Sequence, residues 1–444
     1  MAKNYIAPLS LLCASLCFAS IELRAHEMDS DRLKSIVDAA IRPVMKEYAV
    51  PGMAVGLTVD GKHYFFNYGV ASKESGQRVT ETTLFEVGSV SKLFTGLVGA
   101  YGAVTGEVSL TASASSYMPA LGGSSFDGIT LLQLGTYTAG GLPLQFPREV
   151  RDEASMVSYY RNWKPAYAAG TQRVYSNPSI GLFGHLAAAG IGRPFEDILE
   201  DTIFPGLGLT NTYVRVPPAR MGDYAFGYTK DGKPIRINSG VLGAEAYGVR
   251  TGSADLLKFL DANIEAPEDE RLRQAIAGTH TGHVRIGAMT QGLGWEMYDF
   301  PVPLDVLLAG NAPEISGKPN AAVWIDPPAP PRRNVLLNKT GATNGFGAYV
   351  AVIPAERLGI VLLANRAYPI PARIRAAVPE SRQGHALERL RPLVGPAQHG
   401  SVRRNQRDDV AQEAAAHAKG TLRGLEPDEP QAGRRSGISR AGAL

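Results

Sequence analysis

Hydrophobic and polar positions at the two ends of the chain repeat with different periods. Residues 33–44 put their apolar side chains on one helix face, and polar residues at 29–31 can cap that helix. Apolar stretches at 53–59 and 63–68 flank Asp60-Gly61-Lys62, and stretches at 347–353 and 358–364 flank a Pro-Ala-Glu-Arg turn, so each pair predicts a β-hairpin. Residues 89–261 predict mostly helices and long loops. We therefore expect an α+β fold in which both ends of the chain build a sheet domain around a helical one.

The first 25 residues combine a lone Lys3 with an apolar run at 6–21. This pattern is typical of a secretory signal, and the run is too short to span a bilayer. Small residues suited to cleavage occur at Ala19 and Ala25, and Ala25 is favoured because polar residues follow it. We expect export to the periplasm; a buried N-terminal strand or helix is the alternative. The two cysteines, Cys13 and Cys17, both lie here, so the exported protein would carry no thiol.

Residues 381–444 hold ten Arg and one Lys against seven acidic residues, and no Phe, Tyr or Trp. Such a composition buries too little apolar surface to fold, so we expect a disordered extension. The net charge of +3 comes from this extension and the leader, and the body between them is slightly acidic. The body has no basic stripe, no zinc spacing and no aromatics interleaved with Arg, which argues against nucleic-acid binding.

Residues 85–95 place Ser89 one helical turn before Lys92, after a glycine and at the start of an apolar helix. Positions i and i+3 share a helix face, so the Lys92 ammonium can reach the Ser89 hydroxyl. A serine beside a base is what acyl transfer requires, and a helix N-terminus favours developing negative charge. The motif alone is weak, because Ser89 fits equally well as a helix cap with Lys92 in solvent.

Two further motifs follow along the chain. The Tyr-Ser-Asn sequence at 175–177 is of loop type, and Tyr175 and Asn177 can point into one cleft. The Lys-Thr-Gly sequence at 339–341 puts Lys339 on an expected edge strand, with a glycine that lets a ligand backbone approach. Taken singly, Tyr175 would be half-buried packing and Lys339 a solvated charge. The three motifs in this order form a specific combination.

With these motifs the chain resembles the serine β-lactamase and penicillin-binding protein superfamily, and most closely the class C (AmpC-type) β-lactamases. The resemblance spans about residues 29–377 and includes segments 140–147, 175–184, 245–249, 291–296 and 344–349. Class A enzymes match less well, since they have Ser-Asp-Asn where this chain has Tyr-Ser-Asn. The implied fold is β-lactamase/transpeptidase-like: an antiparallel sheet flanked by helices, a mostly helical domain, and an active site in the groove between them. The expected divisions are a signal peptide at 1–25, the sheet domain at 26–85 and 245–378, the helical domain at 86–244, and a non-family tail at 379–444.

The resemblance implies hydrolysis of the β-lactam ring of cephalosporins and penicillins, which would confer antibiotic resistance. Ser89 would attack the lactam carbonyl and form an acyl-enzyme. Tyr175, with a pKa lowered by the ammonium groups of Lys92 and Lys339, would act as general base or relay the proton with Lys92. Which of the two holds the proton at each step stays open. The backbone N–H groups of Ser89 and Ala342 would form the oxyanion hole.

The resemblance also implies a substrate-binding set and a list of partners. Gln145 and Asn177 would bond the ligand's amide side chain, and the ligand's carboxylate would face the other members; the set is Gln145, Asn177, Tyr247 on the pocket wall, Thr340, Gly341, Ala342 and Arg373. We expect no metal and no cofactor. The expected partners are small-molecule β-lactams, with no nucleic acid, no stable membrane association after signal removal, and a monomeric protein.

Two departures from the class C pattern lie beside the expected site. Ala367 and Ile370 stand where the family often has asparagines, and neither offers a hydrogen bond. Recognition of the ligand carboxylate would therefore fall more heavily on Lys339, Thr340 and Arg373. Gly243 stands where an acidic residue is common, which leaves the mobility of its loop open.

The largest departure is the C-terminus. The family's closing helix would begin at 371–373, but Pro379 should stop it after barely two turns. We hypothesise that the ancestral reading frame was lost near Val378, which would leave an incompletely covered sheet face.

Two other classes of function fit the sequence. One is a penicillin-binding D,D-carboxypeptidase or a carboxylesterase on the same fold; the Lys-Thr-Gly strand argues against the esterase and the loop match against the peptidase. The other is an inactive or destabilised protein, which the altered C-terminus favours.

Overall fold

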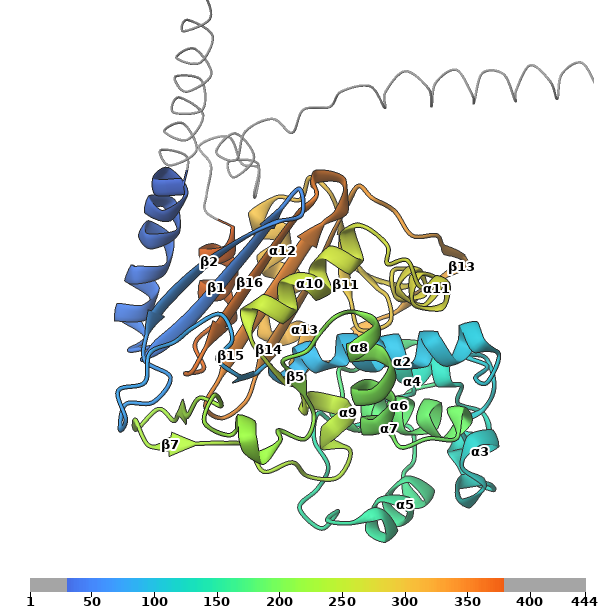
Figure 1. The fold of residues 1–444 in the computed structure, drawn as a ribbon. Helices are drawn as coiled ribbons and strands as arrows, with labels where there is room; N and C mark the ends of the chain where they lie inside the picture. Colours follow the sequence, from blue (N-terminus) through green and yellow to red (C-terminus); the bar gives the residue numbers. More distant parts are fainter. Residues whose placement is uncertain (1–29, 379–444) are drawn as a thin grey trace, which may run out of the picture. The chain divides into compact units, whose positions relative to one another are not determined.

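A nine-stranded antiparallel sheet forms the centre of the structure, a computed structural model that describes residues 30–378 (Figure 1). The predicted leader and tail lie outside these residues. The strands, in their order across the sheet, are β13 (Val323–Ala329), β9 (Gly282–Ile286), β10 (Met289–Gln291), β11 (Glu296–Asp299), β14 (Val335–Ala342), β15 (Gly347–Ile353), β16 (Leu358–Ala364), β1 (Gly52–Val59) and β2 (Lys62–Gly69).

Both predicted hairpins are present. Strands β1 and β2 pair with Val55 opposite Phe66, and the turn uses Asp60 and Gly61, whose φ angles are 52° and 79°. Strands β15 and β16 pair with Val350 opposite Val361 across the short 3-10 helix η6 (Pro354–Glu356). The first and last strands of the described chain therefore lie side by side at β16 and β1, as the sequence predicted for a sheet built from both ends.

Both faces of the central strands are buried, and successive residues of a strand point to opposite faces. Along β15, the side chains of Ala348, Val350 and Val352 join one hydrophobic cluster. Those of Tyr349 and Ile353 join a second cluster on the other face. The sheet is thus the middle of three layers.

Three helices cover the face that holds the second cluster. The predicted N-terminal helix spans residues 30–47 and buries Leu33, Val37 and Ile41. The other two are α12 (Leu304–Gly310) and α14 (Ile370–Ala377). Helix α14 ends one residue before the end of the described chain, in agreement with the prediction of a closing helix of about two turns.

The opposite face carries α10 (Ser253–Ile264), which packs on β1 and β16, and then the helical part of the chain. Two long helices, α2 (Ser91–Thr105) and α6 (Asn177–Ile191), pack together there. The remaining helices are α3 (Ala114–Tyr117), α4 (Leu131–Gly135), α5 (Glu153–Asn162), α7 (Phe195–Ile198), α8 (Phe204–Gly206), α9 (Gly243–Tyr247), α11 (Glu270–Thr279) and α13 (Pro313–Gly317), with a π-helix η4 (Leu199–Ile203) and 3-10 turns η1 (Gly88–Val90), η2 (Pro119–Leu121), η3 (Ser125–Asp127) and η5 (Pro218–Arg220).

Three small sheets lie outside the nine-stranded sheet. Their strands are β3 (Phe85–Glu86), β8 (Arg250–Thr251) and β5 (Thr212–Tyr213) in one sheet, β12 (Asn320–Ala321) with β4 (Gln172–Arg173) in another, and β6 (Gly227–Tyr228) with β7 (Pro234–Ile235) in a third. Helix α11 packs against α2 although its residues fall in the range expected for the sheet domain. All described residues belong to one compact unit, and the expected domain boundaries remain a proposal. Within residues 30–378 no helix combines the length and apolar character needed to cross a membrane.

The expectation that the Lys-Thr-Gly motif lies on an edge strand is wrong for the strand as a whole. Strand β14 lies inside the sheet, between β11 and β15. However, β11 pairs only with Val335–Asn338, whereas β15 pairs with Leu337–Ala342. Residues 339–342 therefore extend beyond the end of β11 and have one unpaired side, because β11 is shorter than β14.

Candidate active site

Ser89 lies in the tight turn η1, between the short strand β3 and helix α2. The turn starts at Gly88, whose φ of 52° is in the left-handed region that glycine adopts without strain. A Cβ atom at Gly88 would come within 2.6 Å of the backbone of Ala342, and one at Gly341 would overlap the Val87 carbonyl. The two glycines therefore allow the Ser89 turn and the end of β14 to touch backbone to backbone.

Lys92 is completely buried in the first turn of α2. Its Nζ donates to Ser89 Oγ at 2.9 Å, to Asn177 Oδ1 at 2.7 Å and to the Ala246 carbonyl at 2.6 Å. Ser89 makes no side-chain cap on this helix. The alternative of a helix-capping serine with a solvated lysine is therefore wrong, and the predicted Ser–Lys contact is present.

The Tyr-Ser-Asn motif leads into helix α6. Ser176 caps the helix by accepting from the Ser179 N–H, and Asn177 is the first helical residue. Burial holds the Tyr175 ring against Tyr137, with ring centroids 4.8 Å apart. The Nζ atoms of Lys92 and Lys339 lie 5.3 Å and 5.0 Å from the centre of the Tyr175 ring. The three motifs thus converge on one place.

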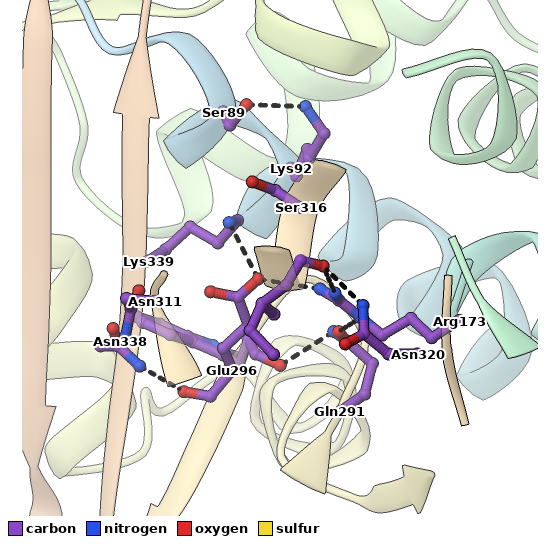
Figure 2. Close-up of polar contacts among 12 residues, drawn as sticks. Ser89, Lys92, Arg173, Gln291, Glu296, Asn311, Ser316, Asn320, Asn338 and Lys339 are labelled. Atoms are coloured by element: carbon purple, nitrogen blue, oxygen red, sulfur yellow. Dashed lines mark hydrogen bonds and ion pairs between the residues drawn. The ribbon is translucent and has the colours of Figure 1, made fainter. Parts of the chain in front are cut away.

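A buried ionic network supports the sheet side of this place, and the sequence reasoning missed it (Figure 2). Glu296 on β11 forms ion pairs with Arg173 at 3.0 Å and with Lys339 at 3.3 Å. Arg173 also donates to Gln291 Oε1 at 2.9 Å and to the Ile315 carbonyl at 3.0 Å. One signal was available in the sequence: Arg173 stands two residues before Tyr175 in a stretch otherwise free of charge.

These charges shift the pKa values of the site in opposite directions. Burial lowers the pKa of Lys92 to about 8, with Tyr175 opposing and Lys339 adding to the decrease. Burial also acts to lower the pKa of Lys339, but the Glu296 carboxylate and Tyr175 outweigh it, so this pKa is raised. Burial acts to raise the pKa of Tyr175, but the Lys339 and Lys92 ammonium groups outweigh it and this pKa falls below its usual value. The site therefore favours an ionisable tyrosine between two amines of unequal basicity.

A groove of about 230 Å³ opens over this cluster. It is lined by most of the residues that the resemblance singled out, namely Ser89, Gln145, Tyr175, Asn177, Lys339, Thr340, Gly341, Ala342 and Arg373. Lys92 lies buried beneath Ser89, and Tyr247 on α9 does not line this groove, so its place on the pocket wall remains a prediction. Ile370, which stands where an asparagine is common, does line it.

A larger cavity of about 560 Å³ lies elsewhere, around β9, β10 and β11. None of the predicted site residues lines it, and its wall lacks a serine or lysine. We therefore assign the chemistry to the smaller groove. Among residues 30–378, no group of three or more His, Cys, Asp or Glu side chains is placed to hold a metal ion.

The fold and the groove together define a class of protein. A large antiparallel sheet with helices on both faces, and a serine, a tyrosine and two lysines meeting in a groove beside it, is the β-lactamase/transpeptidase-like arrangement that the sequence predicted.

Comparison with known proteins identifies the family. A family model for beta-lactamases matches residues 37–380. A beta-lactamase of Pseudomonas fluorescens is 51% identical over 346 residues, which make up 78% of this chain and 97% of that protein. The crystal structure of a class C beta-lactamase in complex with cefoxitin is 46% identical and has a TM-score of 0.77, covering 79% of this chain and 98% of the other. A D-alanine carboxypeptidase AmpC from Burkholderia cenocepacia is 49% identical with a TM-score of 0.75, covering 78% and 97%. The chain belongs to the beta-lactamase family, and the resemblance to class C is confirmed.

Proposed function

We propose that the protein hydrolyses the β-lactam ring of cephalosporins and penicillins through an acyl-enzyme on Ser89, and that it confers resistance to these antibiotics. The observation that carries the proposal is the meeting of Ser89, Lys92, Tyr175 and Lys339 at the floor of one groove. A serine whose hydroxyl contacts a lysine of lowered pKa is an activated nucleophile.

Acylation begins when Ser89 Oγ attacks the lactam carbonyl carbon. The hydroxyl proton passes to a base, the C–N bond of the ring breaks, and the ring nitrogen takes up a proton as it leaves. As an ammonium ion, Lys92 uses its three N–H groups on Ser89, Asn177 and Ala246 and has no lone pair to accept a proton. In that state the Tyr175 oxygen is the acceptor, whereas the neutral amine of Lys92 can accept the proton directly.

The backbone N–H groups of Ser89 and Ala342 serve as the oxyanion hole in this proposal. Gly88 lies against the Ala342 backbone and Gly341 against the Val87 carbonyl, which supports the proposal because the two segments come together without intervening side chains. A donor of this kind contributes roughly 3–4 kcal/mol to the transition state. Water then attacks the ester carbonyl, the bond to Ser89 Oγ breaks, and the serine regains its proton.

Substrate binding uses both sides of the groove. The Asn177 Oδ1 atom accepts from Lys92, which leaves the Asn177 amide N–H groups for the ligand's side-chain carbonyl, with Gln145 beside it. Lys339 and Thr340 on the free end of β14 face the ligand's carboxylate. Ile370 offers no hydrogen bond there, so we expect this carboxylate to depend on Lys339 and Thr340 more than in relatives with an asparagine.

The proposal includes the cellular setting. We infer export to the periplasm through the signal at residues 1–25, followed by action as a monomer without stable membrane association. The loss of the ancestral frame near Val378 stays a hypothesis; the family match, which ends at residue 380, supports it. Limited proteolysis that left residues beyond 378 intact and protected would contradict it.

The decisive experiment is hydrolysis of a chromogenic cephalosporin by the purified exported protein, with Ser89→Ala beside it and intact-mass analysis of both. Turnover that is lost in Ser89→Ala supports the proposal. A stable adduct on Ser89 without turnover would instead indicate a penicillin-binding protein. If the folded protein shows no turnover and forms no adduct, the proposal is overturned.

A second candidate function is D-alanine carboxypeptidase activity, which the name of the Burkholderia cenocepacia relative favours. The same serine would then attack the terminal peptide bond of a D-alanyl-D-alanine peptide. Release of D-alanine from such a peptide at a rate comparable to cephalosporin hydrolysis would support it, and absence of release beside rapid β-lactam turnover would exclude it.

A further inference from the structure

Arg373 is a buried arginine that donates hydrogen bonds to backbone carbonyls. It lies on α14 and is 3% exposed. Its Nε and Nη2 atoms donate to the Tyr368 carbonyl at 2.9 Å and 2.6 Å, and Nη1 donates to the Gly341 carbonyl at 2.5 Å and, more weakly, to the Ala348 carbonyl at 3.4 Å. No carboxylate of residues 30–378 forms an ion pair with it.

One of these bonds reaches the catalytic machinery. The Gly341 carbonyl and the Ala342 N–H belong to the same peptide unit, and a peptide unit is planar. A donor that fixes the carbonyl on one side therefore fixes the direction of the N–H on the other. A cationic donor also polarises the amide, so its N–H becomes a stronger donor.

The surroundings of Arg373 are arranged for this contact. A Cβ atom at Gly347, opposite Ala342 in the β14–β15 ladder, would lie 3.2 Å from the Arg373 guanidinium carbon. Glycine at this position therefore leaves room for the guanidinium above the strands. The Tyr368 ring holds the other side of the group, with its centroid 5.1 Å from the guanidinium carbon.

The free end of β14 needs such support. Residues 339–342 have no backbone partner on β11, so the backbone of the strand end pairs with β15 and contacts the Ser89 turn. A hydrogen bond from α14 adds a third point of attachment at Gly341.

We propose that Arg373 is a positioning residue for the oxyanion hole, which orients and polarises the Gly341–Ala342 peptide, and that this role, rather than recognition of the ligand carboxylate, explains its place at the groove. This rests on the proposed function, because that proposal assigns the Ala342 N–H to the oxyanion hole. The role also gives α14 a direct part in catalysis through a single side chain.

The test uses phenylboronic acid, which forms a tetrahedral adduct with an active-site serine and carries no carboxylate. We expect Arg373→Met to raise its inhibition constant by about tenfold to a hundredfold, since one misaligned oxyanion donor costs up to that order. Arg373→Lys keeps the charge but loses the planar guanidinium with its several donors. Its inhibition constant should lie between those of Arg373→Met and the native protein. An unchanged inhibition constant in a folded Arg373→Met protein would overturn the proposal.

The second readout separates positioning from carboxylate recognition. A chromogenic cephalosporin and its C4 methyl ester are compared as substrates. Positioning lowers kcat for both by a similar factor in Arg373→Met, whereas recognition raises KM for the free acid alone. A KM effect confined to the free acid would overturn the proposal.

Two further variants keep the test decisive. Arg366→Met is the matched control, because Arg366 also donates to backbone carbonyls, but to those of Ala49 and Lys230 and not to that of Gly341; it should change neither readout. Gly347→Ala crowds the guanidinium while leaving Arg373 in place, and should weaken phenylboronic acid binding even if the Arg373 variants do not fold. Lack of cephalosporin turnover by the native protein would count against the proposed function, while the phenylboronic acid comparison would still decide the role of Arg373.

Discussion

The two buried lysines on opposite sides of the groove differ in their partners. Lys92, on the helical side, contacts a hydroxyl, an amide and a backbone carbonyl, all neutral, and its pKa falls to about 8. Lys339, on the sheet side, contacts the Glu296 carboxylate, and its pKa is raised. Both are fully or almost fully buried, and both lie close to the Tyr175 ring.

The difference shows that burial alone does not set the protonation of a lysine; the charge of its partners decides. A lysine among neutral acceptors can lose its proton near neutral pH and take part in proton transfer. A lysine held by a carboxylate stays a cation and supplies a fixed positive field. We therefore expect Lys92 to move a proton and Lys339 to stabilise negative charge on Tyr175 and on the ligand.

The largest expected effect comes from removing each amine. Lys92→Gln should lower kcat about 10³-fold, as expected for loss of a general acid–base group, and Lys339→Gln should lower it less while raising KM for a carboxylate-bearing cephalosporin. Steady-state kinetics measure both, with the exposed Lys34→Gln as control. If both variants lose the same activity, with the same changes in kcat and in KM, the two lysines do not have different roles.

Removing the carboxylate should make the two lysines more alike. Glu296→Gln leaves Arg173 and Lys339 without their anion, and we expect a loss of roughly 3–5 kcal/mol in the free energy of unfolding, measured with urea. The pKa of Lys339 should also fall, so the alkaline limb of the pH–rate profile moves to lower pH. Glu314→Gln, an exposed carboxylate on α13, is the control. An alkaline limb that does not move would show that Glu296 does not hold the charge of Lys339.

Glu245 is a buried carboxyl group without the two cationic partners that Glu296 has, so we expect its removal to stabilise the protein at high pH instead of destabilising it. Glu245 on α9 has its nearest basic group, His185, at 3.9 Å, and burial lowers the pKa of that histidine, which weakens it as a cationic partner. Burial raises the pKa of Glu245 from 4.5 to about 8, with Glu196 adding to the increase.

The direction in which Glu245 makes stability depend on pH follows from proton linkage. The folded protein binds this proton more tightly than the unfolded chain, so stability is fully present below pH about 4.5 and is lost as the pH rises through about 8. Glu245→Gln should match the native protein at pH 5 and exceed its stability at pH 9 by about 4–5 kcal/mol, the free energy that corresponds to a rise of the pKa from 4.5 to about 8. Thermal unfolding at the two pH values tests this; a variant less stable at both would count against it.

The smallest expected effect is on the acid limb of the pH–rate profile. If neutral Lys92 is the base, kcat/KM should fall about tenfold for each pH unit below about 8, because the protonated amine cannot accept a proton. Tyr175→Phe should lower the rate but keep this limb. If the limb disappears in Tyr175→Phe, the tyrosine is the base in the acid range, and the two groups titrate as a pair.

The sequence was most informative where the signal is local. The turn at Asp60-Gly61 between alternating strands and the spacing of Ser89 and Lys92 depend on neighbours within a few residues, and both appear in the structure as predicted. The pairing of Arg173 with Glu296 joins residues 123 positions apart and has no local pattern, so it was missed. The edge strand expected for Lys339 was wrong for β14 as a whole, which lies inside the sheet. The open end at residues 339–342 depends on the length of β11, which composition does not reveal.

The overhang of β14 limits the length of unpaired strand that the sheet offers to a second chain. An unpaired strand edge normally invites a second chain to pair with it and aggregate. Here the open stretch covers residues 339–342 only, and the groove around it is closed on the far side by residues of α12 and α13 such as Gly310 and Ile315. A ligand of dipeptide size can lie along this stretch, whereas a strand of another protein finds too few backbone partners to stay. The same short length of unpaired backbone thus admits a small ligand and limits pairing with a second strand.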